Sequence, residues 1–134
     1  MPRPPVILYD SDCGLCRWTL GIVLAWDRRR RLEPVALQSA RAQDLLRGME
    51  RDEQMASWHL VTSEGQIRSA GQALPDLLAL LPGGRPLGTA FRRFPRTTER
   101  LYFAVADNRS RLGRLLPRTA VERASARIRE REPR

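Results

Sequence analysis

The chain has 134 residues, a mass of 15.3 kDa and a net charge of +9, with 42% hydrophobic and 29% charged residues. These values describe one soluble domain that is large enough to bury a single core, and no second domain is needed. The charge invites an interpretation as a nucleic-acid binder, but all 24 basic residues are arginine, a pattern that biased codon usage produces at exposed positions. We therefore expect a solvated, arginine-rich surface and no nucleic-acid partner.

The N-terminal residues do not resemble a secretory signal, since MPRPP is followed by only four apolar residues before Asp10. The longest apolar stretch, residues 15–26, is interrupted by Arg17 and is too short to cross a bilayer. We therefore expect a cytoplasmic protein with no membrane span. Two closely spaced cysteines in a reducing compartment favour catalysis or metal binding over a structural disulfide.

The first half of the chain alternates strand and helix patterns. Residues 6–9 (VILY) predict a buried strand, and apolar spacing over residues 13–29 predicts a helix directly after a tight turn. Residues 32–37 (LEPVAL) predict a second strand, whose proline indicates an edge position or an irregular start. Residues 40–48 predict a short helix that ends at a glycine, and the polar residues 47–55 predict a loop or a frayed helix.

The second half begins with a β-hairpin pattern over residues 57–69, two short strands around a glycine-containing turn. Residues 71–81 predict a helix with a proline in its first turn, whereas residues 85–98 show no clean period. Apolar spacing over residues 98–116 predicts one further helix. The tail, residues 118–134, has few large apolar residues and predicts a solvated helix or a disordered end.

The predicted order is therefore β-α-β-α-β-β-α with an additional C-terminal helical segment. A parallel βαβ start followed by a hairpin and a helix is the arrangement of the thioredoxin-like fold, an α/β sheet with helices on both faces. We expect this domain to occupy residues 1–117 and the arginine-rich tail to follow it at residues 118–134.

The two cysteines form a CGLC motif between the first strand and the first helix. At this spacing Cys13 and Cys16 share one helix face and can form a disulfide. Cys13 would lie at the helix N-terminus, where free backbone N–H groups stabilise a thiolate, and Cys16 would be more shielded. Thiol-disulfide exchange needs this combination of an exposed nucleophile and a protected resolving thiol.

Charged neighbours of the motif have opposed effects on the nucleophile. Arg17 should favour the Cys13 thiolate, whereas Asp10 and Asp12 should disfavour it by repulsion between like charges. If Asp10 is partly buried at the end of the strand, it could accept the proton of Cys16 during exchange. The alternative role for Asp10 is to cap the helix.

Two other interpretations of the cysteines are weaker. A structural zinc site needs four ligands, and the only other soft ligand, His59, is far along the chain in a predicted strand, so we expect no metal. Burial as small apolar residues would explain either cysteine alone but not two at disulfide spacing. We interpret His59 as a packed or surface residue, and Trp18 as a core residue that could shape substrate access.

The stretch YDSDCGLC resembles the DxxCxxC signature of the DCC family of thioredoxin-like thiol-disulfide oxidoreductases. The resemblance continues through LEPVALQS, the hairpin and LYFAVADNRSRLG, and it covers about residues 6–116. It implies that Cys13 and Cys16 are the redox pair and that Asp10 is the acid of the motif. Tyr102 and Arg109 match positions of the late-helix pattern, where helix packing and a charged contact are the simplest roles.

Two positions depart from the patterns that this resemblance implies. Ser11 follows the motif acid, where the family usually has glycine. Thioredoxin places a proline before the strand that faces its cysteines, whereas Met55, Ala56 and Ser57 precede Trp58 here. The residue that normally helps orient a peptide substrate is therefore missing.

The sequence thus predicts a thiol-disulfide oxidoreductase that needs no cofactor and acts on protein or small-molecule thiols and disulfides. The alternative is a non-catalytic basic adaptor that keeps the fold and binds an anionic partner through its arginines. A low pKa of the Cys13 thiol together with scattered arginines would favour the enzyme. An ordinary pKa together with a single arginine face would favour the adaptor.

Overall fold

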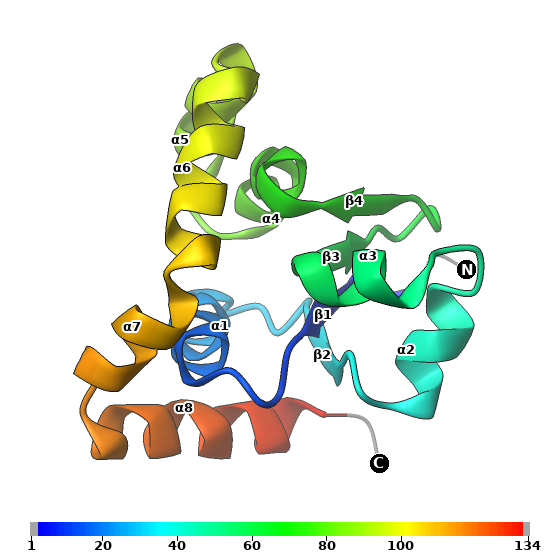
Figure 1. Cartoon of the computed structure of the whole chain (residues 1–134). Coiled ribbons are helices and arrows are strands. Elements are labelled where there is room, and N and C mark those ends of the chain that lie inside the picture. Colours follow the sequence, from blue (N-terminus) through cyan, green and yellow to red (C-terminus); the bar gives the residue numbers. More distant parts are fainter. Residues whose placement is uncertain (1–2, 133–134) are drawn as a thin grey trace.

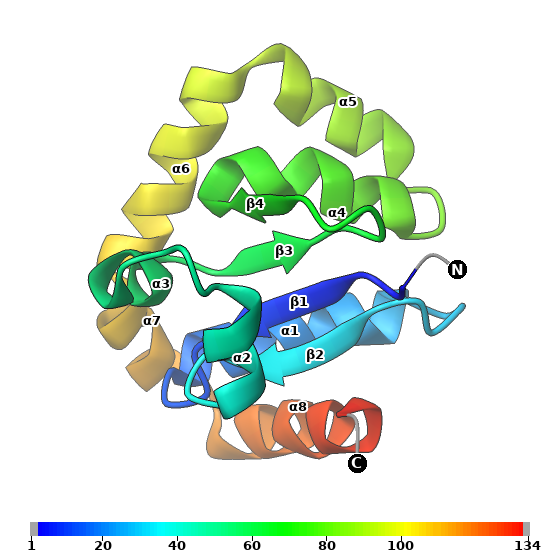
Figure 2. The same ribbon diagram turned by 90° about the vertical axis from the view of Figure 1, so that its right-hand side faces the viewer.

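A four-stranded mixed sheet forms the centre of the protein in a computed structural model that describes residues 3–132. Its strands follow the order β2-β1-β3-β4, with β1 parallel to β2, antiparallel to β3, and β3 antiparallel to β4. Figure 2 shows this sheet between helices. The strand bounds are β1 (Val6–Tyr9), β2 (Glu33–Ala36), β3 (His59–Val61) and β4 (Ile67–Ser69).

The helices account for most of the remaining described chain (Figure 1). Their bounds are α1 (Gly14–Trp26), α2 (Ala40–Leu45), α3 (Arg51–Ala56), the 3-10 helix η1 (Ala70–Ala73), α4 (Leu74–Leu80), α5 (Arg85–Arg93), α6 (Pro95–Asp107), α7 (Arg109–Leu115) and α8 (Arg118–Arg131). The four predicted strands are present, and α3 forms where a loop or frayed helix was expected. This mixed α/β architecture is consistent with a thioredoxin-like fold.

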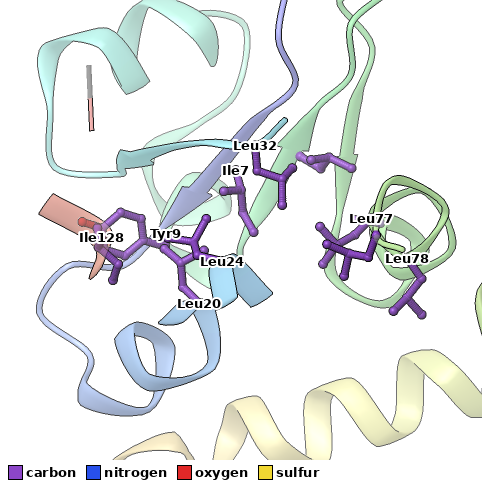
Figure 3. Close-up of a cluster of buried hydrophobic side chains, with 11 residues drawn as sticks. Ile7, Tyr9, Leu20, Leu24, Leu32, Leu77, Leu78 and Ile128 are labelled. Atoms are coloured by element: carbon purple, nitrogen blue, oxygen red, sulfur yellow. The ribbon is translucent and has the colours of Figure 1, made fainter. Parts of the chain in front are cut away.

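Different helices cover the two faces of the sheet, because alternate side chains of a strand point to opposite sides. Ile7 and Tyr9 belong to a core cluster that includes residues of α1, α4 and α8, as Figure 3 shows. Val6 and Leu8 belong to a second cluster on the other face, which α2 covers. Pro34 lies in the edge strand β2, where its missing N–H group removes no hydrogen bond to a further strand.

The segment after residue 84 differs most from the sequence prediction. Residues 85–98, which have no clean period, form α5 and the first turn of α6. The single helix expected over residues 98–116 is two helices, because the chain breaks at Asn108, whose side chain donates to the Ala104 carbonyl at 2.7 Å. The break lets α7 turn away from α6 and pack on α1 (Figure 1).

Helix α8 forms where the sequence predicted a solvated helix or a disordered end, and one side of it is docked on the domain. It runs along α1 and buries Ala124 and Ile128. A Cβ atom on Gly21 of α1 would lie 2.5 Å from the Cβ of Ala124, so only glycine permits this close approach. Few apolar residues are enough to dock α8 because the small residues Gly21 and Ala124 let the two helix backbones come close together. Within residues 3–132, no helix is both long and apolar enough to span a bilayer.

Candidate active site

The cysteine motif lies at the junction of β1 and α1. Asp10 follows β1, and its carboxylate accepts the N–H of Asp12 at 3.0 Å while its carbonyl accepts the N–H of Cys13 at 3.3 Å. These two bonds form the tight turn that sends the chain into α1. Cys13, and not Asp10, occupies the N-cap position of the helix, so the capping alternative for Asp10 is wrong.

The two thiols have opposite acidities. The Sγ of Cys13 accepts the backbone N–H of Cys16 at 3.2 Å, and both cysteines are half-buried free thiols. The Cys16 thiol, the helix-terminal N–H and Arg109 together lower the pKa of Cys13 to about 6, against burial and the charge of Asp10. Donation to Cys13, burial and the Cys13 charge raise the pKa of Cys16. The two thiols therefore differ in acidity, and the one at the helix N-terminus has the lower pKa.

The cation near the thiols is Arg109, whereas the sequence pointed to Arg17. Arg17 instead donates to the Ser125 hydroxyl of α8 at 3.2 Å. Arg109, the first residue of α7, places its Nη1 3.8 Å from the Oδ2 of Asp10 and lowers the pKa values of both cysteines. Proximity along the chain was misleading here, because the break at residue 108 brings a distant arginine to the motif.

Gln38 is a residue of the site that sequence reasoning missed. Its amide nitrogen donates to Asp10 Oδ1 at 2.7 Å and to Asp12 Oδ2 at 3.3 Å. Its carbonyl oxygen accepts the N–H and the hydroxyl of Ser11, at 3.1 and 2.8 Å. Ser11 thus ties the turn to the end of β2. The only available signal was the position of Gln38 directly after the second predicted strand, next to the expected site.

A cavity of about 360 Å³ adjoins the thiols between α1, α4 and α6. Leu20 of α1, Leu77 of α4 and Tyr102 of α6 line it. Its walls include Cys16 but not Cys13, together with Asp10 and Arg109. The cavity therefore reaches the dithiol from the side of Cys16. Trp18 is not part of its lining.

Tyr102 joins the cavity to the segment before β3. Its hydroxyl accepts the backbone N–H of Trp58 at 3.2 Å. Burial and the nearby Cys16 raise the pKa of Tyr102 to about 12, against the effect of the Trp58 N–H and Arg109, so the phenol is neutral at physiological pH. Its role is thus more than helix packing, since it fixes the backbone opposite the cysteines.

His59 lies outside the site, as expected. Its ring nitrogens contact the Ser69 hydroxyl at 2.6 Å and the Gln54 carbonyl at 2.9 Å, and burial lowers its pKa. The ring therefore links α3 to the hairpin as a buried structural residue. Among residues 3–132, no group of three or more histidine, cysteine or acidic side chains is placed to hold a metal ion.

Fold and site together define a mixed α/β protein that carries a CxxC dithiol at the N-terminus of the helix after its first strand. Residues 7–115 match the DCC1-like thiol-disulfide oxidoreductase family, and the chain belongs to this family. The resemblance inferred from YDSDCGLC is thereby confirmed. Comparisons with curated proteins and with solved structures find no match.

Proposed function

We propose that the protein is a thiol-disulfide oxidoreductase with Cys13 as the nucleophile and Cys16 as the resolving thiol. The observation that carries this proposal is the lowered pKa of Cys13, about 6, beside a Cys16 thiol whose pKa is raised. At neutral pH the first cysteine is a thiolate and the second holds its proton. Family membership supports the same reaction class.

The reaction proceeds in two exchanges. The Cys13 thiolate attacks one sulfur of a substrate disulfide, forms a mixed disulfide and releases the other sulfur as a thiolate. Cys16 then loses its proton and attacks the Cys13 sulfur, which releases the second substrate thiolate and leaves a Cys13–Cys16 disulfide. The substrate gains two electrons and the protein dithiol loses two, and the reverse sequence oxidises a substrate dithiol.

Asp10 is the proposed proton acceptor for Cys16. Its side chain is only 12% exposed, and both residues line the same cavity. Proton transfer to a neighbouring carboxylate would make the buried Cys16 thiol reactive only after Cys13 has lost its charge in the mixed disulfide. Arg109 Nη1 lies 3.8 Å from the same carboxylate, so a cation and the proposed acceptor lie together beside the thiols.

The first test measures alkylation of the reduced protein as a function of pH. Because only the thiolate reacts, the Cys13 rate should rise with a midpoint near pH 6 and level off above it, instead of rising near the ordinary value of about 8.5. Cys13→Ser should abolish disulfide exchange, whereas Cys16→Ser should accumulate a mixed disulfide on Cys13, seen by mass spectrometry.

Two results would contradict the proposal. One is an ordinary thiol pKa for Cys13 together with failure of the protein to form an internal disulfide in a redox titration. The other is equal loss of exchange in both serine variants without any trapped mixed disulfide. The first result would favour the alternative, a basic adaptor that keeps the fold without catalysis, and the second would contradict the roles assigned to Cys13 and Cys16.

A further inference from the structure

The cavity beside Cys16 has the composition of a small-molecule site. Its volume of about 360 Å³ lies within the range of known ligand pockets, and aliphatic and aromatic side chains form most of its wall. The charged residues in its lining, Asp10 and Arg109, both lie at the end where Cys16 is. An occupant would therefore need an apolar body and a reactive or polar group at one end only.

Helix α6 covers this space without filling it. Leu101 and Val105 line the cavity and yet remain 58% and 50% exposed. Apolar side chains on a helix face normally pack against a core, and here they face an open volume between α1 and α4. The unfilled volume against which these α6 side chains lie thus has the size of a small-molecule ligand.

The segment opposite the cysteines is poorly suited to a peptide substrate. An extended peptide binds by pairing with free backbone groups. The N–H of Trp58 already donates to the Tyr102 hydroxyl at 3.2 Å, and its carbonyl accepts the Ala70 N–H at 3.3 Å and the Ser57 hydroxyl at 3.1 Å. Both backbone groups of Trp58 are therefore engaged within the chain.

We propose that the cavity binds the uncharged alkyl or aryl arm of a low-molecular-weight disulfide. This inference rests on the proposed function and names its substrate class. Attack by the Cys13 thiolate on the sulfur that bears the arm forms Cys13–S–S–R and expels the other half as a thiolate. The arm R then lies in the cavity past Cys16, whose attack on the Cys13 sulfur forms the protein disulfide and releases R–S⁻.

Two matched substrates test the proposal: hexyl 2-hydroxyethyl disulfide and bis(2-hydroxyethyl) disulfide, whose alkyl leaving thiolates are alike in basicity. Each buried methylene favours binding roughly fourfold. We therefore expect kcat/KM of the reduced wild-type protein to be higher for the hexyl compound by about tenfold or more. Equal values for the two disulfides, or faster reaction of a disulfide-bonded peptide, would overturn the inference while leaving the proposed function intact.

A pair of variants on α6 shows whether the preference arises in the cavity. Ala106 lines the cavity, so Ala106→Phe should fill it and bring the ratio of the two kcat/KM values close to one. Ala104 is exposed on the same helix and outside the lining, so Ala104→Phe should keep the wild-type ratio. A ratio that falls equally in both variants would overturn the assignment to the cavity.

Binding without chemistry separates this inference from the proposed function and avoids any folding defect of the variants. Hexyl 2-hydroxyethyl sulfide, a thioether that cannot exchange, should bind the wild-type protein and Cys13→Ser equally in calorimetry. Absence of binding to either protein would overturn the inference. Binding of the thioether together with no reaction of either disulfide would refute the oxidoreductase and, with it, the assignment of a disulfide as the ligand.

Discussion

An aspartate and an arginine meet at each end of α1, but the two pairs are built differently. Beyond its C-terminal end, Asp27 and Arg131 are 3.0 Å apart, and their side chains are 0% and 8% exposed. Before its N-terminal end, Asp10 and Arg109 are 3.8 Å apart and are 12% and 37% exposed. The same residue types thus form a closed contact at one end and an open one at the other.

The closed pair satisfies its hydrogen-bonding groups within the protein. Asp27 accepts the N–H groups of Arg31 and Leu32 at 3.1 and 2.9 Å as well as the Arg131 guanidinium. Arg131 also donates to the carbonyls of Leu24 and Asp27, at 3.1 and 2.9 Å. This network pairs both buried charges within the protein and holds α8 against the end of α1.

The open pair is part of a reactive site. Arg109 contacts Asp10 loosely and shifts the pKa values of Cys13 and Cys16. In a tight, buried contact the fields of the two charges would largely cancel at the thiols. In a long and partly exposed contact each charge can still act on the thiols. Exposure and distance, more than residue type, therefore separate the structural pair from the functional one.

The largest expected effect comes from breaking the closed pair. Arg131→Ala leaves the buried Asp27 carboxylate without its cation, so we expect a loss of about 3 kcal/mol or more in the free energy of unfolding. Urea denaturation measures this loss. Arg129→Ala, an exposed position on the same helix, should change the stability by about 0.5 kcal/mol at most. Similar values for the two variants would contradict the structural role.

The next largest effect is expected from removing the arginine of the open pair, Asp10 and Arg109. Arg109→Leu removes a charge that favours the Cys13 thiolate, so the pH midpoint of alkylation should move above about 6. At pH 6 the alkylation rate should fall severalfold, while stability changes by less than about 1 kcal/mol because the pair is partly exposed. Arg111→Leu, exposed on the same helix, serves as the control. An unchanged pH midpoint of alkylation together with a large loss of stability would mean that the Asp10–Arg109 pair is structural, like the Asp27–Arg131 pair.

The smallest expected shift in acidity comes from Asp10→Asn. Asp10 raises the pKa of Cys13, and its effect is the smallest among the groups that shift this pKa. The alkylation midpoint of Asp10→Asn should therefore fall slightly below that of the wild type. The second exchange should slow, because Cys16 loses its proposed proton acceptor, and quenched-flow mass spectrometry should show a longer-lived mixed disulfide. Asp12→Asn, which is exposed, should not prolong it. An unchanged lifetime in Asp10→Asn would remove Asp10 from the reaction.

Local sequence patterns predicted the part of the molecule that holds the cysteines. The buried run VILY and the apolar spacing after the motif are set by contacts with the sheet and the core, so β1 and α1 form close to the expected bounds. Cys13 was expected at the helix N-terminus and lies there. Both features depend on neighbours within a few residues, which a sequence displays directly.

The groups that surround the dithiol depend on long-range packing and could not be read from local patterns. Arg109 reaches the motif only because the chain breaks at Asn108, and the helical spacing on both sides concealed that break. Gln38, after β2, bonds to the turn before α1, and Tyr102 of α6 bonds to the segment before β3. In α8, few large apolar residues suggested a solvated tail, because the sequence does not display the close fit of Ala124 on Gly21.

The docking of α8 also sets an order of events during synthesis. Helix α8 covers one side of α1. The ribosome makes α8 after all four strands. Until α8 has emerged, the nascent chain therefore leaves uncovered the apolar surface on which Ile128 packs in the folded protein. Chaperones bind such surfaces, and the redox motif at the start of α1 reaches its final setting only after translation has passed α7 and α8.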